Sequence, residues 1–436
     1  MTPHYCYWLQ MVQGSKSKGV FNTSMLVMLV MVVFVGVGEK LADRFLPLYL
    51  GALGAGAVAF GALNALINLL GALYSYPGGW LSDRYGYRRA LVIFTMMSAL
   101  GYALVIVIPY WWAVFAGALL FGAWTAISLP AVMSLISKSV PPNRRALGVS
   151  LHSLTRRIPM ALGPVIGGAL IVMFVRRHGE SLGTVIAIRM AFAIAMVLAL
   201  ITIGLIWRYV KEDGEVLQKP ARLRESLRYF SPELRVLLVA DMFVRFAEQL
   251  PYAFLAVWVC RNLAVSEVKF GWLTALEMVT AMLVYLPVAW LADRGTKKPY
   301  VVITFCFFTL FPMSLWLAGW LPQKLSQPSL LFPLLTVAFI IRGLKEFGEP
   351  TRKSLILDLA PEHAKAATFG AYYLIRDGIV SVVALTAGFL WRFDPLANFA
   401  TATVCGMVGT IYFAWRGRDL HRLRHSNSHF GGGDGS

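Results

Sequence analysis

Acidic side chains occur inside long apolar segments of this chain, where a charge is energetically unfavourable. At the centre of a bilayer a charged side chain costs about 3 kcal/mol or more, so each one is expected to have a partner, a cavity or a function. A carboxyl group in such a place can carry protons, because desolvation favours its neutral, protonated form. The proton-coupling residues that we predict are Glu39, Asp43, Asp241, Glu248, Glu277 and Glu346.

The first charged segment follows a long apolar run. Glu39 and Asp43 are four residues apart, as are Lys40 and Arg44, so an acidic and a basic stripe would lie side by side on one helix. The apolar run 20–38 is nearly long enough to cross a bilayer by itself. These four charges therefore lie either inside the membrane, facing a cavity, or at its outer surface.

The second charged segment places Asp241, Arg245 and Glu248 on one helix face, with the arginine between two acids. These residues either line a cavity or form a self-contained ladder of ion pairs that stiffens the bundle. Glu277 stands almost alone among apolar neighbours, and it is either a proton carrier or a hydrogen-bonded packing residue.

The third charged segment carries four charges within eight residues. Arg342 and Glu346 are four residues apart, as are Lys345 and Glu349, so both pairs can form along one helix. Four charges so close together must also face water or other helices. We therefore expect this segment to line a cavity.

The composition identifies the class of protein that positions these charges. Hydrophobic residues make up 58% of the 436 residues and charged residues only 14%, which excludes an ordinary soluble domain. The net charge of +18 is concentrated in alternate loops, so it indicates membrane topology and not a nucleic-acid-binding face. The four scattered cysteines predict neither a disulfide framework nor a metal site. The chain has no phosphate-binding loop, no nucleophile with a base and no convincing cleavable signal, so we expect neither an enzyme nor a cofactor.

An internal duplication organises the chain. The segments 58–84 and 268–294 are 210 residues apart and agree, without a gap, at twelve of 27 positions. The shared residues include the pairs Phe60/Phe270, Pro77/Pro287, Trp80/Trp290, Asp83/Asp293 and Arg84/Arg294. Chance agreement among apolar residues does not produce a Pro, Trp, Asp and Arg in register, so the chain is a tandem repeat.

Long apolar segments divide the chain into five parts. We predict a tail at 1–20, six membrane helices within 21–208, a linker at 209–232, six more helices within 233–415 and a tail at 416–436. Positive residues gather in the linker, the tails and the loops on the same side, so both termini are expected in the cytoplasm. The basic linker is either an amphipathic helix on anionic lipid or a solvated tether.

The sequence between the second and third helices, Gly79-Trp-Leu-Ser-Asp-Arg-Tyr-Gly-Tyr-Arg-Arg-Ala-Leu91, is expected to be a tight basic turn. It resembles the loop G-x-L-a-D-r-x-G-r-k-x-x-l of the major facilitator superfamily, and it departs from that pattern at Tyr87. The resemblance implies an all-α membrane protein of twelve transmembrane helices in two pseudo-symmetric six-helix halves. It also implies a conformational-switch loop, to which we assign Gly79, Asp83, Arg84, Gly86, Arg88, Arg89, Asp293 and Arg294.

A second resemblance lies in the predicted fifth helix. Gly163, Pro164, Gly167 and Gly168 are similar to the G-P-x-x-G-G end of a motif of proton-driven exporters in that superfamily, and the departure is at Pro159. Small residues at this spacing allow close helix contact.

The family resemblance implies a central cavity lined by helices one, four, seven and ten. The cavity residues that we predict are Lys40, Arg44, Asn64, Asn68, Trp124, Arg156, Arg245, Arg342, Lys345, Glu349 and Arg376. Asn64 and Asn68 either bind substrate or join helices, and Arg156 and Arg376 correspond in the two repeats. A cavity with both signs of charge suits a charged or amphoteric organic molecule.

The expected function is secondary active transport of a small organic solute by alternating access, with proton-coupled export as the first reading. An uncoupled facilitator, a proton-coupled importer and a membrane sensor or scaffold without transport are the alternatives. The expected partners are the solute, protons and lipids of the cytoplasmic membrane. We expect a monomer with no nucleic acid and no metal.

Overall fold

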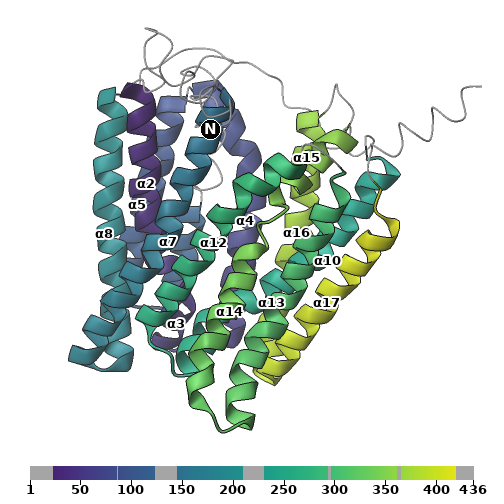
Figure 1. The fold of residues 1–436 in the computed structure, drawn as a ribbon. Coiled ribbons are helices and arrows are strands. Elements are labelled where there is room, and N and C mark those ends of the chain that lie inside the picture. Colours follow the sequence, from purple (N-terminus) through teal and green to yellow (C-terminus); the bar gives the residue numbers. More distant parts are fainter. Residues whose placement is uncertain are drawn as a thin grey trace, which may run out of the picture.

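The computed structural model describes residues 23–85, 87–122, 145–209, 230–292, 296–360 and 365–418. Regular structure in these ranges is helical throughout, which confirms the predicted all-α class. The helices form an upright bundle (Figure 1).

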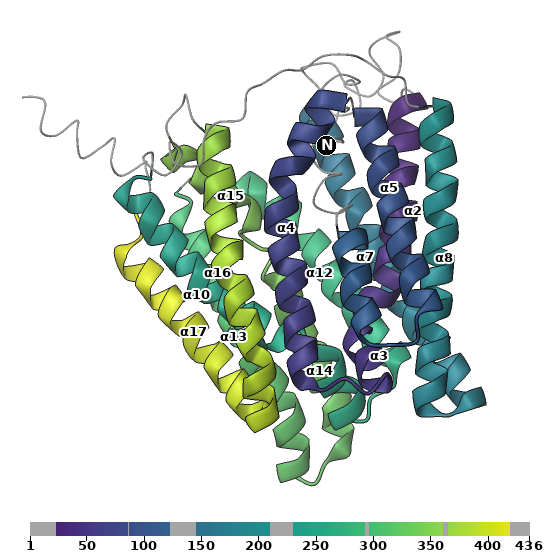
Figure 2. The same ribbon diagram turned by 180° about the vertical axis from the view of Figure 1, so that it is seen from behind.

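The first repeat supplies one side of the bundle. Its helices are α2 (Thr23–Asp43), α3 (Leu46–Ala52), α4 (Ala57–Tyr85), α5 (Tyr87–Val107), a helix over Trp112–Gly122, α7 (Arg145–His178) and α8 (Glu180–Tyr209). In both views of the ribbon α2, α5 and α8 lie at one edge of the bundle, and α4 lies near its middle (Figures 1 and 2).

The second repeat supplies the other side. Its helices are α10 (Pro232–Tyr252), α11 (Leu255–Val257), a π-helical turn η2 (Trp258–Asn262), α12 (Glu267–Ala292), α13 (Lys298–Lys324), a 3-10 turn η3 (Pro328–Leu330), α14 (Leu331–Leu344), α15 (Glu349–Leu359), α16 (Lys365–Phe393) and α17 (Pro395–Arg416). The helices α10 and α17 lie at the edge opposite α8 (Figure 2).

The helices follow the order of the twelve predicted spans. Six of them are, within the described residues, long and apolar enough to cross a membrane: Arg88–Val107, Thr155–His178, Glu180–Tyr209, Lys298–Lys324, Thr368–Phe393 and Pro395–Arg416. The first, seventh and tenth predicted spans are each interrupted, as α2–α3, α10–η2 and α14–α15. These interrupted spans also carry the three charged segments.

Proline and glycine account for two of the interruptions. Pro47 stands in the first turn of α3, and Pro350 in the first turn of α15, where a missing backbone N–H is tolerated. A proline cannot continue a preceding helix, because it lacks the N–H that the helix would use. The chain therefore bends between α2 and α3 and between α14 and α15, inside the bundle.

The predicted loop at 79–91 is largely helical, which corrects the sequence-based expectation of a tight turn there. Helix α4 continues to Tyr85 and α5 begins at Tyr87, so little chain remains for the turn itself. The prediction placed the ends of the two helices where the apolar pattern stops. Both helices instead continue beyond their apolar segments through polar residues.

The two repeats pack against each other in symmetric pairs, which supports the predicted pseudo-symmetry. A methyl group built on Gly61 of α4 would lie 2.8 Å from the backbone nitrogen of Gly388 in α16. At the equivalent position 210 residues later, a methyl group on Gly271 of α12 would lie 2.4 Å from the carbonyl oxygen of Pro164 in α7. Helix α4 thus packs on α16 as α12 packs on α7, and both contacts join the two halves.

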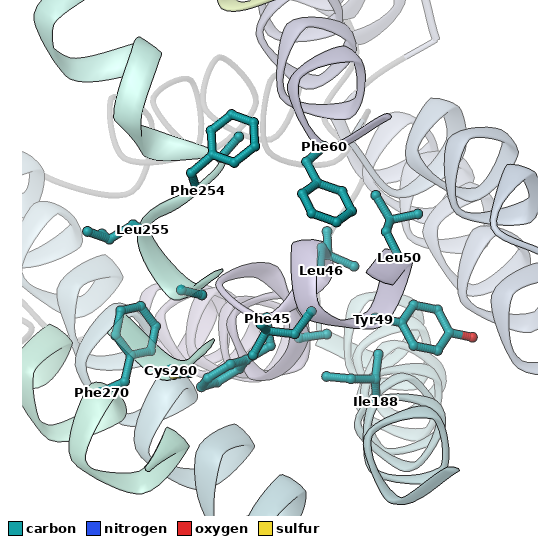
Figure 3. Close-up of a cluster of buried hydrophobic side chains, with 14 of the residues drawn as sticks. Phe45, Leu46, Tyr49, Leu50, Phe60, Ile188, Phe254, Leu255, Cys260 and Phe270 are labelled. Carbon is teal, nitrogen blue, oxygen red and sulfur yellow. The ribbon is translucent and has the colours of Figure 1, made fainter. Parts of the chain in front are cut away.

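An apolar cluster from both halves fills the end of the bundle at which α3 lies. Figure 3 shows Phe60 facing Phe254 and Phe45 close to Phe270. The ring centroids are 6.1 Å apart in the first pair and 5.7 Å in the second. Each pair joins one half to the other, so this end of the bundle is closed by a symmetric aromatic contact.

Candidate functional site

A cavity of about 310 Å³ lies next to the aromatic contact, between the halves. Its polar lining consists of Glu39, Lys40, Asp43, Arg44, Asn64, Asn68, Tyr102, Gln249 and Tyr252. Its aromatic lining includes Phe60, Phe121, Phe192 and Phe270. A mostly apolar cavity with a few polar groups is typical of small-molecule sites.

The first charged segment forms one wall of this cavity. Lys40 Nζ donates to Glu39 Oε1 at 2.8 Å and to Asp43 Oδ2 at 2.9 Å. Because α3 extends the helix beyond the charges, these residues lie inside the bundle and not at the end of the first span. The side chains of all three are about one-fifth exposed, so they remain accessible from the cavity.

Glu277 has three cationic neighbours, which corrects the expectation that it stands alone. Its side chain is 1% exposed, and its carboxylate oxygens lie 3.1 Å from Arg342 Nη1, 3.8 Å from Arg44 Nη2 and 3.9 Å from Lys345 Nζ. Arg342 comes from α14 and Lys345 from the turn after it, whereas Arg44 comes from the other half. They are distant in sequence, so neighbouring residues could not reveal them.

Carboxamide side chains join the halves across the cavity. Asn68 Nδ2 donates to Gln249 Oε1 at 3.0 Å, and Asn64 Nδ2 donates to the same oxygen at 3.2 Å. These bonds connect α4 to α10. Asn64 and Asn68 therefore join helices and also line the cavity, where substrate binding stays a prediction.

The sequence analysis did not select Gln249 or Tyr252. Gln249 follows Arg245 by four residues and Tyr252 follows Glu248 by four, so both lie on or beside the charged face of α10. Extending that face by one helical turn would have found them. Tyr252 lies between two cations: its ring centroid is 5.0 Å from the Arg44 guanidinium carbon and 5.6 Å from that of Arg342.

Asp241 is the centre of a buried network of ion pairs in the second half. Its Oδ2 accepts a short hydrogen bond from Arg352 Nη1, one from the Tyr372 hydroxyl at 3.0 Å and one from Arg376 Nη1 at 3.3 Å. Arg245 Nε lies 3.8 Å from the other oxygen. The expected ladder along α10 is thus part of a network that joins α10, α15 and α16.

The same network includes Glu248 and Glu349. Arg245 donates to Glu248 Oε2 at 2.7 Å and to Glu349 at 3.3 Å. Lys345 donates to the other Glu248 oxygen at 2.5 Å, and Arg352 donates to Glu349 Oε1 at 2.6 Å. Each acid therefore has at least two bases, and the charges compensate one another inside the bundle.

The expected pairing along the third charged segment is wrong. The helix is interrupted between Leu344 and Glu349, so residues four apart do not share a face. Lys345 points to Glu248, and Glu346 instead accepts a hydrogen bond from Arg157 Nη2 at 3.0 Å. That second bond links the bend to α7 of the other half.

The repeat-related residues Arg156 and Arg376 occupy different surroundings. Arg156 of α7 lies close enough to Glu39 and Arg157 for their charges to interact. Arg376 of α16 is bound to Asp241 and, at 2.7 Å, to Asp377. Only Arg156 is thus placed beside the wall of the cavity.

The glycine motif of α7 provides close contacts with two helices. Methyl groups on Gly163 and Gly167 would lie 2.6 Å from Lys40 Cβ and 2.0 Å from the Leu41 carbonyl oxygen, both in α2. A methyl group on Gly168 would lie 2.3 Å from the Glu267 carbonyl oxygen in α12 of the other half. Pro164 contributes its carbonyl to the Gly271 contact described above.

The predicted switch loop is described only in part. Arg88 Nη2 donates to the Trp207 carbonyl at 2.7 Å, which caps the end of α8 within the same half, and Arg89 is exposed. In the second repeat, Lys297 donates to Ser354 at 2.6 Å and to Asp358, again within its half. Gly79, Asp83 and Arg84 belong to α4, and their side chains lie outside the described part of the structure. Gly86, Trp124, Asp293 and Arg294 lie outside the described residues altogether.

Within the described ranges, no three His, Cys, Asp or Glu side chains gather in a way that could hold a metal ion. The site therefore consists of ion pairs, carboxamides and aromatic rings. Such groups bind, orient and exchange protons.

Comparisons with known proteins agree with this architecture. The family model of the Major Facilitator Superfamily matches residues 28–241. An uncharacterized MFS-type transporter of Methanocaldococcus jannaschii is 21% identical over 377 residues, which cover 84% of this chain and 88% of that protein. MdtD of Pectobacterium carotovorum is provisionally assigned as a multidrug resistance protein. It is 32% identical to this chain over 99 residues, which cover 22% of this chain and 21% of the relative. The crystal structure of the nucleoside transporter NupG superposes with a TM-score of 0.72 at 12% identity and covers 89% of this chain and all of that one. The chain belongs to the Major Facilitator Superfamily and is a multi-pass membrane transporter, not an enzyme.

Proposed function

We propose that this transporter exchanges a small, charged or amphoteric organic solute for protons. The observation that carries the proposal is the cavity between the halves, where Glu39 and Asp43 share one lysine. Two acids that share a base at the cavity wall provide a site that a proton or a cationic group can occupy in turn.

Alternating access would proceed by rocking of the two halves about the cavity. The aromatic contact and the glycine contacts close the end of the bundle near α3. At the opposite end, the hydrogen bond of Arg88 lies within its own half. The predicted topology assigns that opposite end to the cytoplasm, so we infer an inward-facing arrangement with both termini on the cytoplasmic side of the membrane.

Competition between a proton and a cationic group of the solute would provide the coupling. Protonation of Glu39 or Asp43 would weaken its bond to Lys40 and shift the balance between the two conformations. A solute that binds the deprotonated pair and leaves when a proton arrives moves against the proton flow. This sequence of events is antiport.

Two observations favour export as the direction. The glycine motif of α7 resembles that of proton-driven exporters, and it makes the close contacts with α2 and α12 that such a motif allows. The similarity to MdtD covers a limited part of the chain but is consistent with this direction.

Proton-coupled import is the second candidate, because Arg44 also lines the cavity. An anionic solute attracted to this cation would neutralise it and leave a nearby acid to take up a proton. Solute and proton would then travel together. The direction of proton movement separates the two candidates.

The test uses purified protein in proteoliposomes with an imposed pH gradient and a panel of small organic cations, anions and zwitterions. Antiport predicts that a compound placed on the side away from the proton pool dissipates the gradient by exchange, and that Asp43→Asn reduces this effect about tenfold. Glu180→Gln is the matched control, because Glu180 is 66% exposed outside the cavity.

Two results would overturn the proposal. Solute flux without any proton movement would mean that the protein is an uncoupled facilitator. Ligand binding with no flux for any compound would mean that it is a sensor or scaffold.

A further inference from the structure

We propose that Arg44 binds the anionic group of an organic monoanion or zwitterion, and that Glu277 is the internal anion that competes for it. The proposal rests on the proposed function only in treating this ligand as the transported solute. The site lies where the turn between α2 and α3 of one half faces α12 and α14 of the other.

Arg44 has hydrogen-bonding capacity that the described residues do not use. It lines the cavity, and its Nη1 is buried without a hydrogen-bond partner in the part of the chain that the structure describes. Its Nη2 lies 3.8 Å from Glu277, a distance that allows charge attraction but exceeds a hydrogen bond. A buried guanidinium donor left unsatisfied is unfavourable, and an anion in the cavity would satisfy it.

The acids around Arg44 are bound to other bases. Three acids lie close enough to act on it, namely Asp43, Glu248 and Glu277. Each is held by a different base, and these pairs are Asp43 with Lys40 at 2.9 Å, Glu248 with Lys345 at 2.5 Å and Glu277 with Arg342 at 3.1 Å. Arg44 is therefore a cation that lines the cavity and remains available to a ligand.

Arg342 acts as a positioning residue for this site. Its side chain is 2% exposed, and its Nε and Nη1 make no hydrogen bond with the residues described. Its charge holds Glu277 on the side away from the cavity, because Glu277 lies closer to Arg342 than to Arg44. Tyr252 lies beside both guanidinium groups and offers its ring to each of them.

The remaining lining restricts the class of ligand. Glu39 and Asp43 precede Arg44 by five residues and by one residue, and both face the same cavity, so a second negative charge on the ligand would be repelled. Phe121 and Phe192 provide an apolar wall for its body. A carboxylate on an aromatic or aliphatic body fits these constraints, with or without an amino group directed to the acids.

The first experiment compares matched ligands on the purified full-length protein in detergent. Phenylacetate and phenylacetamide have the same body and differ in charge, and L-phenylalanine and L-phenylalaninamide differ in the same way. We expect millimolar carboxylates to raise the unfolding temperature and the amides to have little effect. Phthalate, a dianion, should bind more weakly than benzoate.

Variants then assign the effect to Arg44. Arg44→Gln should reduce carboxylate affinity by about ten- to hundredfold, the range expected for loss of a hydrogen bond between charged groups. Lys324→Gln removes an exposed cation at the end of α13 and should leave the affinity unchanged.

The sign of the Glu277 effect separates competition from a structural role. Glu277→Gln removes the internal anion and should strengthen carboxylate binding several-fold. Arg342→Gln should weaken it, because Glu277 would then turn to Arg44. The double variant Arg342→Gln/Glu277→Gln should regain the affinity, and it leaves neither charge unpaired, so it also guards against misfolding of the single variant.

Equal binding of acids and amides by the wild-type protein would overturn the proposal, as would the absence of binding by every carboxylate tested. Weaker binding by Glu277→Gln would equally overturn it. Failure here is distinct from failure of the proposed function. Flux that does not depend on ligand charge would support the proposed transport function and contradict the anion site. Charge-selective binding without flux would support the anion site and contradict the proposed transport function.

Discussion

The charged clusters of the two halves differ in how far their acidic side chains are exposed. In the second half, Asp241 is 1% exposed and accepts hydrogen bonds from Arg352, Tyr372 and Arg376. In the first half, Glu39 and Asp43 are about one-fifth exposed, and both bind Lys40. The first cluster faces a cavity, and the second connects three helices.

This difference indicates two physical roles. Buried ion pairs pay a large desolvation cost, and removing one partner leaves an uncompensated charge. A closed network of this kind holds helices in one arrangement and exchanges protons poorly. A cluster at a cavity wall can exchange a partner for a proton or a solute, because the replacement can reach it. We therefore expect the second cluster to determine stability and the first to determine transport.

The largest effect is expected for Asp241→Asn. The change leaves Arg352 and Arg376 without their shared acid, and breaking a buried pair costs about 3–5 kcal/mol. Unfolding of the purified protein in detergent, followed by tryptophan fluorescence, would measure the loss. Asp43→Asn serves as the comparison and should cost about 1 kcal/mol or less, because its carboxylate is partly exposed. Equal losses for the two variants would remove the contrast between the clusters.

The next effect concerns the close glycine contacts between helices of the two halves. Gly168→Ala would place a methyl group 2.3 Å from the Glu267 carbonyl, and Gly388→Ala would place one 2.7 Å from Val58 Cα. Overpacking of this kind costs about 1–3 kcal/mol, and it should open the closed end in both variants alike. Labelling of single cysteines introduced near α3 would report the opening.

Gly378→Ala is the control for these two variants, since it lies on α16 with no atom within 4 Å of the added methyl group. Similar effects at Gly168 and Gly388 would restrict the difference between the halves to their charges. Unequal effects would mean that the packing of the repeats also differs.

Loss of an acid from the first cluster is expected to affect transport by a free energy of about the same size as the effect of the glycine substitutions on packing. Glu39→Gln and Asp43→Asn each remove one of the acids that share Lys40, and proton-driven accumulation should fall about tenfold, which corresponds to 1.4 kcal/mol. Exchange of labelled solute without a gradient should persist, because the cavity remains. The measurement is solute accumulation in proteoliposomes at a fixed pH difference. Accumulation that survives in both variants would move proton coupling to another acid.

Much of the architecture followed from periodicity and repetition. The 210-residue offset between Phe60 and Phe270 is preserved in space, where each ring meets an aromatic partner from the opposite half. The order of the spans and the burial of their charges were also predictable, because an apolar segment long enough to cross a bilayer leaves a plain compositional signal.

The partners of the charges were not predictable. Pairing of Lys345 with Glu349 assumed a continuous helix, whereas the break before Pro350 turns Lys345 towards Glu248. The sequence around Glu277 does not reveal its cationic partners, because Arg44 and Arg342 come from distant parts of the chain. Ion pairs between helices depend on packing, and a single sequence does not contain the distances.

The smallest effect is expected for Gln249→Leu, at the boundary between the two regions. This side chain belongs to the second half but accepts hydrogen bonds from Asn64 and Asn68 at the cavity. Its loss should weaken the closed arrangement by about 1 kcal/mol, because neutral hydrogen bonds each contribute about that much and the two amides can turn to the cavity. Solute affinity measured by thermal shift should change less than tenfold. Double-mutant cycles with Asn68→Leu would show coupling if the bond joins the halves, and additive effects would mean that the two amides act on the solute separately.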